Sequence, residues 1–326
     1  MSSSNSYTFA VTRDQLITDS LLYIGAIAES ETPTSAAISE AARLLNMIVK
    51  LRAADGMPLW ALKRATILPE TGVSSMNTTG HIVSSYINTT ISADEASGQT
   101  ILSVTSSTGM TAGDQVGIEM DDATMHWTTI VSVDSSTQIT VTTAIDDEAG
   151  SGNQVFSYTA SSARIGRPLR VLDANMLNVT SNSSWEITTE ERKDYFNLGN
   201  RTTASVPNRL YYDPTLGDAT ADPTSSSTWY GTFYVYPRFE HGEHVIEFTY
   251  QRPFQDFDSS SDHPDFPQEF YLPIMLELAA LSGSKYGVPM DERRALHSEA
   301  KMYREEALST IQSEGSVFLQ PEDENA

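Results

Sequence analysis

The sequence predicts an α+β protein with a mainly α-helical core, a small β-hairpin element and an inserted all-β domain, which is a small barrel or a sandwich. Two observations lead to this fold class. Apolar residues recur at helical spacing near both ends of the chain, and a long middle stretch has its own composition and strand-and-turn pattern. We therefore divide the chain into residues 1–72, 73–162, 163–313 and 314–326.

The first part, residues 1–72, predicts two antiparallel helices. Thr12-Arg-Asp-Gln15 matches a capping box, in which the threonine hydroxyl accepts a bond from a first-turn amide and the glutamine reaches back. Apolar residues then follow at helical spacing from Leu16 to Ala28. A second helix is expected to begin at Thr32-Pro33, because proline is favoured in a first turn, and to end at Asp55-Gly56.

Residues 73–162 predict an inserted β-domain. From Ala65 to Ala163 the chain has 99 residues without Lys or Arg, but with 11 Asp and Glu. Short β-type runs alternate there with Gly, Asp and Ser turn clusters, a pattern typical of a small barrel or sandwich. The runs lie at 100–104, 115–119, 127–133 and 138–143, and the last two predict the clearest hairpin. The abrupt change in composition indicates a separate module.

The second part of the core, residues 163–313, predicts a β-hairpin followed by two helices. The strands of the hairpin are expected at 232–236 and 245–250. One helix is expected from Pro267 to Tyr286, bent or restarted at Pro273, and a last helix from Asp291 to about residue 313. The stripe of the last helix consists of Leu296, Ala300, Tyr303, Ala307 and Ile311. The acidic tail, 314–326, has no period and is expected to be ordered only on a partner.

Composition excludes several classes of protein. The chain has 326 residues, no Cys, and 20 Lys and Arg against 43 Asp and Glu, a net charge of −23. The absence of Cys excludes disulfide scaffolds, zinc–thiolate sites and thiol catalysis. Binding through phosphate neutralisation needs surplus positive charge, so the charge argues against it. No apolar run approaches the roughly 18 residues of a membrane span, and no signal peptide is evident, so we expect a reducing cytosolic setting.

The sequence contains no convincing catalytic or metal motif, and we predict no enzyme activity, no cofactor and no metal. His241-Gly-Glu-His244 places two histidines three residues apart, but we expect an exposed polar turn there rather than a ligand pair. Paired acids such as Asp121-Asp122 are common in so acidic a chain and are interpreted as solvated charge. A glycosidase needs two carboxylates at a fixed separation, which a sequence cannot demonstrate.

Aromatic residues gather in the last third of the chain and have two interpretations. They fill one core between the hairpin and the last helices, which we favour, or part of the set anchors a subunit interface, where aromatic residues are enriched. The connector from Gln251 to Tyr271 is too apolar for an idle linker and too broken by proline for a helix. We therefore expect it to pack across the protomer or a neighbour, with Phe254, Phe257 and Phe266 as candidate subunit-interface residues.

Several motifs, in the same order along the chain, resemble the head-to-tail adaptor family of short-tailed bacteriophages, also called tail accessory factors or packaged-DNA stabilisation proteins. The first half carries the helix opening at Thr12, Glu31-Thr-Pro-Thr and Leu44-Leu-Asn-Met-Ile-Val-Lys-Leu-Arg-Ala-Ala-Asp-Gly-Met57. The second half carries Pro207-Asn-Arg-Leu-Tyr-Tyr-Asp-Pro, Gly231-Thr-Phe-Tyr-Val-Tyr-Pro, Tyr250-Gln-Arg-Pro-Phe-Gln-Asp-Phe-Asp and Asp265-Phe-Pro-Gln-Glu-Phe-Tyr. The resemblance covers roughly 10–70 and 165–312, and the insertion departs from it.

The resemblance implies a helical protomer that joins others in a ring, usually of about twelve copies, beneath the portal protein. Its implied setting is the neck or tail of a virion, reached from the host cytoplasm during assembly. The C-terminal segment would dock on the portal, with Phe318 and Leu319 as its anchors, and the far face would receive a distal tail (nozzle) protein or fibres. DNA would pass through the channel without specific binding, because acidic walls repel phosphates.

Two other functions remain open at this stage. One is a cell-wall hydrolase carried in the tail, which needs an acid/base pair in a cleft. The other is a module that binds a host glycan through the inserted β-domain.

Overall fold

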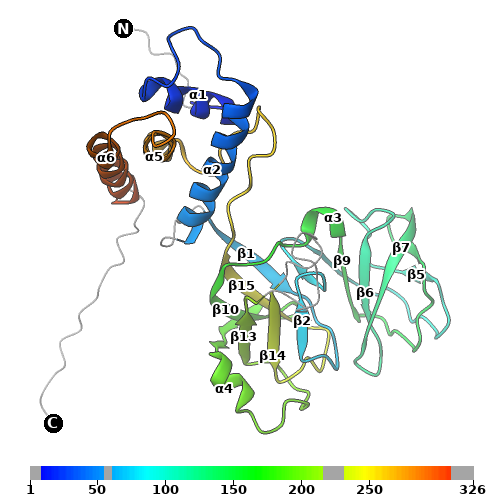
Figure 1. The fold of residues 1–326 in the computed structure, drawn as a ribbon. Helices are drawn as coiled ribbons and strands as arrows, with labels where there is room; N and C mark the ends of the chain where they lie inside the picture. The colour runs from blue at the N-terminus through cyan, green and yellow to red at the C-terminus, as the bar shows by residue number, and fades with distance from the viewer. Residues whose placement is uncertain (1–8, 55–60, 216–230, 310–326) are drawn as a thin grey trace, which may run out of the picture. The chain divides into compact units, whose positions relative to one another are not determined.

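The computed structural model describes residues 9–54, 61–215 and 231–309. The chain forms two compact units, one made of Met1–Ala61 with Pro253–Ala326 and the other of Leu62–Arg252. We call them the helical unit and the β unit, and Figure 1 shows the course of the chain through both.

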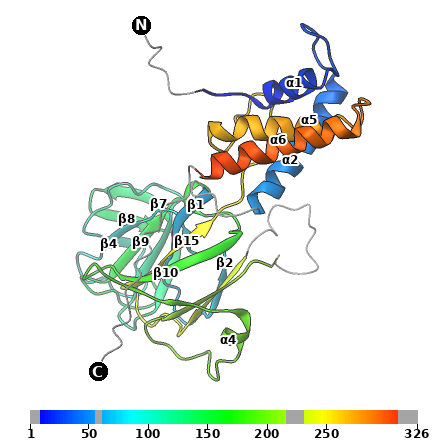
Figure 2. The same cartoon turned by 90° about the vertical axis from the view of Figure 1, so that its left-hand side faces the viewer.

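The helical unit is built from long helices whose apolar stripes face one another. They are α1 (Arg13–Tyr23), α2 (Ser35–Ala54), α5 (Tyr271–Ser282) and α6 (Met290–Ser309), with a 3₁₀ turn η3 (Gln268–Phe270) before α5. Figure 2 shows α5 and α6 running alongside each other. The predicted capping box is confirmed: the amide of Gln15 donates to the Thr12 hydroxyl at 3.3 Å, and the amide of Thr12 donates to the Gln15 side chain at 2.8 Å. The stripe of α6 buries Leu296 and Ala300 against α5.

The β unit contains three sheets within its described residues. A five-stranded sheet has the order β11-β10-β15-β1-β3, a four-stranded sheet the order β12-β13-β14-β2, and a six-stranded sheet the order β4-β9-β6-β7-β8-β5. In chain order the strands are β1 (Leu62–Ile67), β2 (Ser75–Asn77), β3 (Ile82–Val83), β4 (Ile87–Thr90), β5 (Ile101–Ser103), β6 (Gln115–Glu119), β7 (Met125–Ser135), β8 (Gln138–Val141), β9 (Gln154–Tyr158), β10 (Arg170–Asn178), β11 (Ser183–Glu186), β12 (Thr188–Thr189), β13 (Arg209–Asp213), β14 (Thr232–Tyr236) and β15 (His244–Gln251); two short helices are α3 (Ala160–Ala163) and α4 (Arg192–Phe196).

Three core clusters stabilise these sheets, and one of them, which includes Val83, Phe156 and Val245, joins the six-stranded sheet to the five-stranded sheet. The five- and four-stranded sheets share one apolar core, in which Met176, Phe233 and Phe248 are almost completely buried. The six-stranded sheet encloses its own core, which includes Ile118 and Ile139. Burying such side chains contributes about 1.5–3 kcal/mol each, so each core is a substantial source of stability.

The prediction of a mainly α-helical core is wrong. Outside the six-stranded sheet, nine strands form the two further sheets of the described β unit. Local patterns predict only two of these nine, at 232–236 and 245–250. Strand β10 also pairs with the neighbouring β11, but β1 and β10 both depend on β15, which lies far away along the chain and between them in the sheet. Such long-range pairing leaves no local signal comparable to a helical period.

The predicted hairpin of residues 232–236 and 245–250 is also wrong. Both strands exist, as β14 and β15, but β14 pairs with β13 and β2, whereas β15 pairs with β10 and β1. Neighbouring strands in sequence pair in only about two thirds of cases. Here the chain leaves one sheet after β14 and enters the other at β15, so the two strands face each other across the shared core.

The six-stranded sheet spans residues 87–158 and therefore lies within the predicted insertion, 73–162. Its strands β5 to β8 occupy the predicted runs, and β7 and β8 form the predicted hairpin, with Val133 opposite Ile139. However, β2 and β3 also fall within 73–162 and belong to the other two sheets.

Candidate interaction surfaces

The connector between β15 and α5 packs inside the helical unit. Phe254, Phe257 and Phe266 are only 4%, 4% and 7% exposed. Asn46 on α2 forms a two-way bond with the backbone of Phe257, donating to its carbonyl at 3.2 Å and accepting from its amide at 2.9 Å. Lys50 donates to the carbonyl of Phe254 at 2.6 Å. The three rings therefore serve the interior of this chain and leave little area for a neighbouring subunit.

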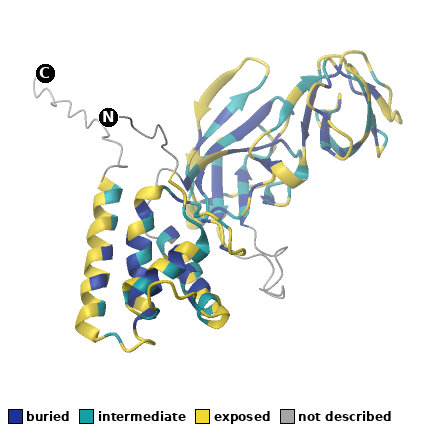
Figure 3. Cartoon of the chain, turned by 90° about the horizontal axis from the view of Figure 1, so that it is seen from above, coloured by how far each residue is buried: buried dark blue, intermediate teal, exposed yellow. Residues whose placement is uncertain are grey.

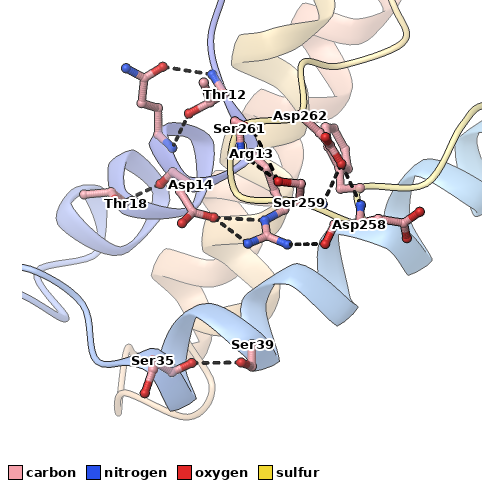
Figure 4. A network of polar contacts seen from close by, with 12 residues as sticks. Thr12, Arg13, Asp14, Thr18, Ser35, Ser39, Asp258, Ser259, Ser261 and Asp262 are labelled. Atoms are coloured by element: carbon pink, nitrogen blue, oxygen red, sulfur yellow. Dashed lines mark hydrogen bonds and ion pairs between the residues drawn. The ribbon is translucent and has the colours of Figure 1, made fainter.

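Polar contacts hold the same connector against the start of α1, as Figure 4 shows. The backbone amide of Arg13 donates a hydrogen bond to the carbonyl of Asp262 at 2.8 Å, and the guanidinium of Arg13 donates to the carbonyl of Asp258 at 3.4 Å. The carboxylate of Asp262 in turn accepts from the amides of Asp258 and Ser259, at 2.8 and 2.6 Å. The prediction that the aromatic residues fill one core is therefore wrong. The rings of the connector pack in the helical unit, whereas those of β13 and β14 pack in the β unit.

Exposed apolar side chains concentrate on the helical unit. Of 14 large hydrophobic residues that are exposed within the described part of the chain, ten belong to this unit, although it is the smaller of the two. Figure 3 shows that α6, the helix leading to the C-terminal trace, is exposed over most of its length. The ten are Phe9, Tyr23, Met47, Leu51, Leu272, Leu281, Tyr286, Met290, Met302 and Tyr303. Exposed apolar side chains mark an interaction site where they adjoin in a patch, whereas scattered ones are common on any protein surface.

Two of these residues form a stripe on α2. Met47 and Leu51 are 65% and 57% exposed, and their spacing of four residues places them on the same side of the helix. The buried side of α2 carries Leu45, Ile48 and Val49. The main helical stripe of the sequence predicts this buried side and does not include Met47 or Leu51. The missed signal was a second apolar pair, offset from the main stripe.

A small pocket lies between α1, α2 and the end of α5. It has a volume of about 200 Å³ and is lined by apolar residues that include Leu21 and Leu44. At its edge Lys285 forms an ion pair with Glu40, whose carboxylate raises the pKa of the lysine by accepting a hydrogen bond from it. A pocket of this size fits one side chain of a partner rather than a substrate of appreciable size.

The β unit contains an acid-lined cleft of about 410 Å³, next to the predicted histidine motif. Glu119, Asp121, His241 and Glu243 line it. Both carboxylate oxygens of Glu119 accept hydrogen bonds from backbone amides, from that of Gly242 at 2.8 Å and from that of Gln154 at 3.1 Å. The carboxylate of Asp121 accepts hydrogen bonds from the backbone amide of Gly150 at 2.7 Å and from the side-chain amide of Asn153 at 2.8 Å. These two carboxylates hold loops together, which explains their position without catalysis.

The two histidines of the motif do not act together. His241 lines the cleft, whereas His244 begins β15 and is buried, with its ring edge against Trp185 at a centroid distance of 5.8 Å. Burial lowers the pKa of His244, so its neutral form is favoured. Within the described residues, no group of three or more His, Asp or Glu side chains could hold a metal ion.

The predicted portal anchors and the expected absence of a membrane span concern other parts of the chain. Phe318 and Leu319 lie outside the described residues. Among the helices that the structure does describe, none combines the length and apolar character needed to cross a membrane.

Comparison with known proteins adds no family to these observations. A scan against protein-family models finds no match to the chain, and a search of curated proteins finds no relative.

Proposed function

We propose that this chain is a structural assembly protein, a head-to-tail adaptor of a short-tailed phage that forms a ring under the portal. The observation that supports this proposal is the set of ten exposed apolar side chains on the helical unit. A solitary chain gains nothing from holding them in water, whereas a subunit buries them against neighbours. In this role the ring extends the DNA channel, helps to retain packaged DNA and offers a site for distal tail components.

The proposal is tested by measuring mass, for the chain alone and after mixing with the portal protein. We expect a monomer, or a small oligomer, that becomes a ring on the portal. The substitutions Met47→Asp and Leu51→Asp together should weaken assembly about 100-fold or more, since each removes roughly 1.5 kcal/mol or more of apolar burial per contact. Trp185→Asp, an exposed aromatic residue of the β unit, is the control. A ring that still forms with the double substitution would contradict the proposal. A wild-type chain that forms no ring, either alone or with the portal protein, would also contradict it.

The tail supplies a second test of the same role. If Phe318 and Leu319 anchor the chain on the portal, replacing both by Ala removes about 3–6 kcal/mol of apolar burial, before the cost of ordering the tail. Virions carrying both substitutions should then assemble poorly or lose DNA. Normal particles with normal DNA content would remove these two residues from the portal interface.

The acid-lined cleft is the observation that favours the hydrolase alternative. A zymogram of the purified protein on cell-wall material tests it directly. Because Glu119 and Asp121 already bind backbone or amide donors, we expect no clearing. Clearing that disappears in Glu119→Gln would establish the alternative.

The glycan-binding alternative needs a narrower deletion than the predicted insertion. Removing 73–162 would also remove β2 and β3, which complete the other two sheets. Removing 87–158 leaves the strands of the other two sheets in place, although it takes Phe156 and Tyr158 out of the core that they share with Val83 and Val245. Particles that assemble without this segment but no longer adsorb to cells would support glycan recognition.

A further inference from the structure

A compact group of aromatic and positively charged residues covers the outer face of the four-stranded sheet. Tyr211 and Tyr234 stack there with ring centroids 5.4 Å apart, on neighbouring strands β13 and β14. Helix α4 lies over them and adds Tyr195 and Phe196, whose centroids are 5.3 and 5.6 Å from that of Tyr234. Tyr195 is only 1% exposed and its hydroxyl points to the carbonyl of Val235 at 3.4 Å. The base of the group is therefore rigid.

Phe196 forms the exposed centre of this group. It is 41% exposed, and two arginines lie over its ring, with the guanidinium carbon of Arg192 at 5.8 Å and that of Arg201 at 5.1 Å. Arg192, Lys193 and Arg201 are all exposed. Within the described part of the chain, none of these three cations forms an ion pair with a carboxylate. We call Arg192, Lys193, Phe196 and Arg201 the arginine–aromatic patch.

The patch is unusual in this chain because its charge is positive. The whole chain carries 20 basic against 43 acidic residues, yet the stretch 192–201 contains three basic residues and one acid, Asp194; of the two acids just before it, Glu190 pairs with Arg209 and Glu191 is exposed. A ring with two guanidiniums held over it has the composition of an interaction hot spot, in which Arg and aromatic residues predominate. The two guanidiniums place positive charge next to the exposed Phe196 ring, so a partner that contacts the ring also meets these charges.

The same chain carries the complementary surface. The six-stranded sheet lies in the stretch from Ala65 to Ala163, which has 11 acids and no Lys or Arg. Exposed carboxylates there include Asp94, Asp134 and Glu148. Figures 1 and 2 both show α4 and the six-stranded sheet at different ends of the β unit. One copy of the chain therefore offers a positive surface and a negative surface at separate places, which is the arrangement that a head-to-tail ring contact requires.

We propose that the arginine–aromatic patch of one copy docks on the acidic six-stranded sheet of the next copy. This contact rests on the proposed function, since it is a contact between ring subunits. It addresses a difficulty of that function, because copies that each carry a charge of −23 repel one another unless positive side chains meet negative ones at the interface. The insertion, which departs from the adaptor resemblance, would then be part of the ring contact.

The first experiment reverses the charge of the patch. Arg192→Glu with Arg201→Glu should weaken ring assembly at least tenfold at low salt, as measured by sedimentation velocity. The matched control is Lys63→Glu with Arg64→Glu, which changes the net charge equally at two exposed positions of β1. Phe196→Ala should also weaken assembly, without a change in its salt dependence. Circular dichroism confirms that each variant is folded.

The second experiment identifies the partner surface. Lys193 and Lys63 are the two lysines of the β unit, so a zero-length carbodiimide crosslink from Lys193 reports which carboxylates touch the patch. With a mixture of isotope-labelled and unlabelled protein, we expect crosslinks between copies, from Lys193 to acids of residues 87–158. Crosslinks from Lys193 only to acids of its own copy, or to those of the helical unit, would overturn the proposal.

The outcomes separate this inference from the proposed function. Rings that form normally with the reversed patch would refute the inference and leave the ring function intact. Rings that form normally but no longer bind the portal would assign the patch to another protein, which also refutes it. A wild-type chain that forms no ring, alone or with portal, would refute the proposed function itself.

Discussion

The ion pair between Arg52 and Glu277 connects α2 to α5 and is the sharpest test of the packing of the helical unit. Their side chains are 18% and 8% exposed. The Nε atom of Arg52 donates to Oε2 of Glu277 at 2.9 Å, and a second guanidinium nitrogen donates to Oε1. The paired geometry satisfies both carboxylate oxygens, so removing one partner leaves a buried charge without its main counter-ion.

We expect Arg52→Met to lower the free energy of unfolding of the helical unit by about 3–5 kcal/mol. The methionine keeps most of the apolar stem, so the loss reports mainly on the stranded carboxylate of Glu277. Replacing both residues, as Arg52→Met with Glu277→Met, should cost far less than the single change, because no buried charge remains. A double-mutant cycle therefore separates the pairing energy from the cost of stranding a charge.

Urea unfolding followed by circular dichroism at 222 nm measures this, because the long helices of the chain lie in the helical unit. With a urea dependence of about 2 kcal/mol per molar, the single substitution should lower the midpoint of the helical transition by roughly 1.5–2.5 M. A loss below about 1 kcal/mol, or a double variant as unstable as the single one, would refute the account of a buried, paired contact.

Three further predictions concern the other elements. Burial lowers the pKa of His81 to about 4, from an ordinary value near 6.5, so the unfolded chain takes up a proton before the folded chain does and stability falls as the pH drops from 6.5 to 4. His81→Phe should flatten that dependence in unfolding curves followed by tryptophan fluorescence, to which Trp127, stacked on the His81 ring with centroids 3.5 Å apart, contributes. Gly117→Ala should cost about 1–3 kcal/mol in urea unfolding, because the new carbon would stand 2.7 Å from the Trp127 ring, whereas Gly166→Ala meets nothing within 4 Å and should be nearly neutral. Thr12→Ala should cost about 1 kcal/mol of helical-unit stability in the dichroism assay, through loss of the α1 cap, and an unchanged midpoint would mean that the cap contributes nothing.

Local signals predicted the local structure correctly. The capping box at Thr12 begins α1, and Leu296 and Ala300 of the predicted stripe are buried, whereas Tyr303 of the same stripe is exposed. Residues Ser136 and Thr137, within the predicted turn cluster Asp134–Thr137, form the turn that joins β7 to β8. In each case the residues that carry the signal lie within a few positions of one another, and one period or one turn determines the outcome.

The candidate surfaces were less accessible from the sequence. The three connector phenylalanines were suspected at a subunit interface, but their burial depends on α2, which lies some 200 residues earlier in the chain. Conversely, Met47 and Leu51 have the composition of core residues, and only the packed structure leaves them exposed. Exposure is a property of what covers a residue, and the covering elements come from distant parts of the chain.

The sequence by itself determined the four long helices of the helical unit, the turn that joins β7 to β8 and the unusual charge of the segment from Ala65 to Ala163, since each depends on neighbouring residues or on composition alone. Only the tertiary structure decided that β14 and β15 enter different sheets, that nine strands of the β unit form two sheets besides the six-stranded one, and that Arg192 and Arg201 meet over Phe196. Strand pairing and side-chain clusters depend on backbone hydrogen bonds and contacts between segments far apart in the chain. Their energies are set by the partner that arrives, which no local pattern encodes.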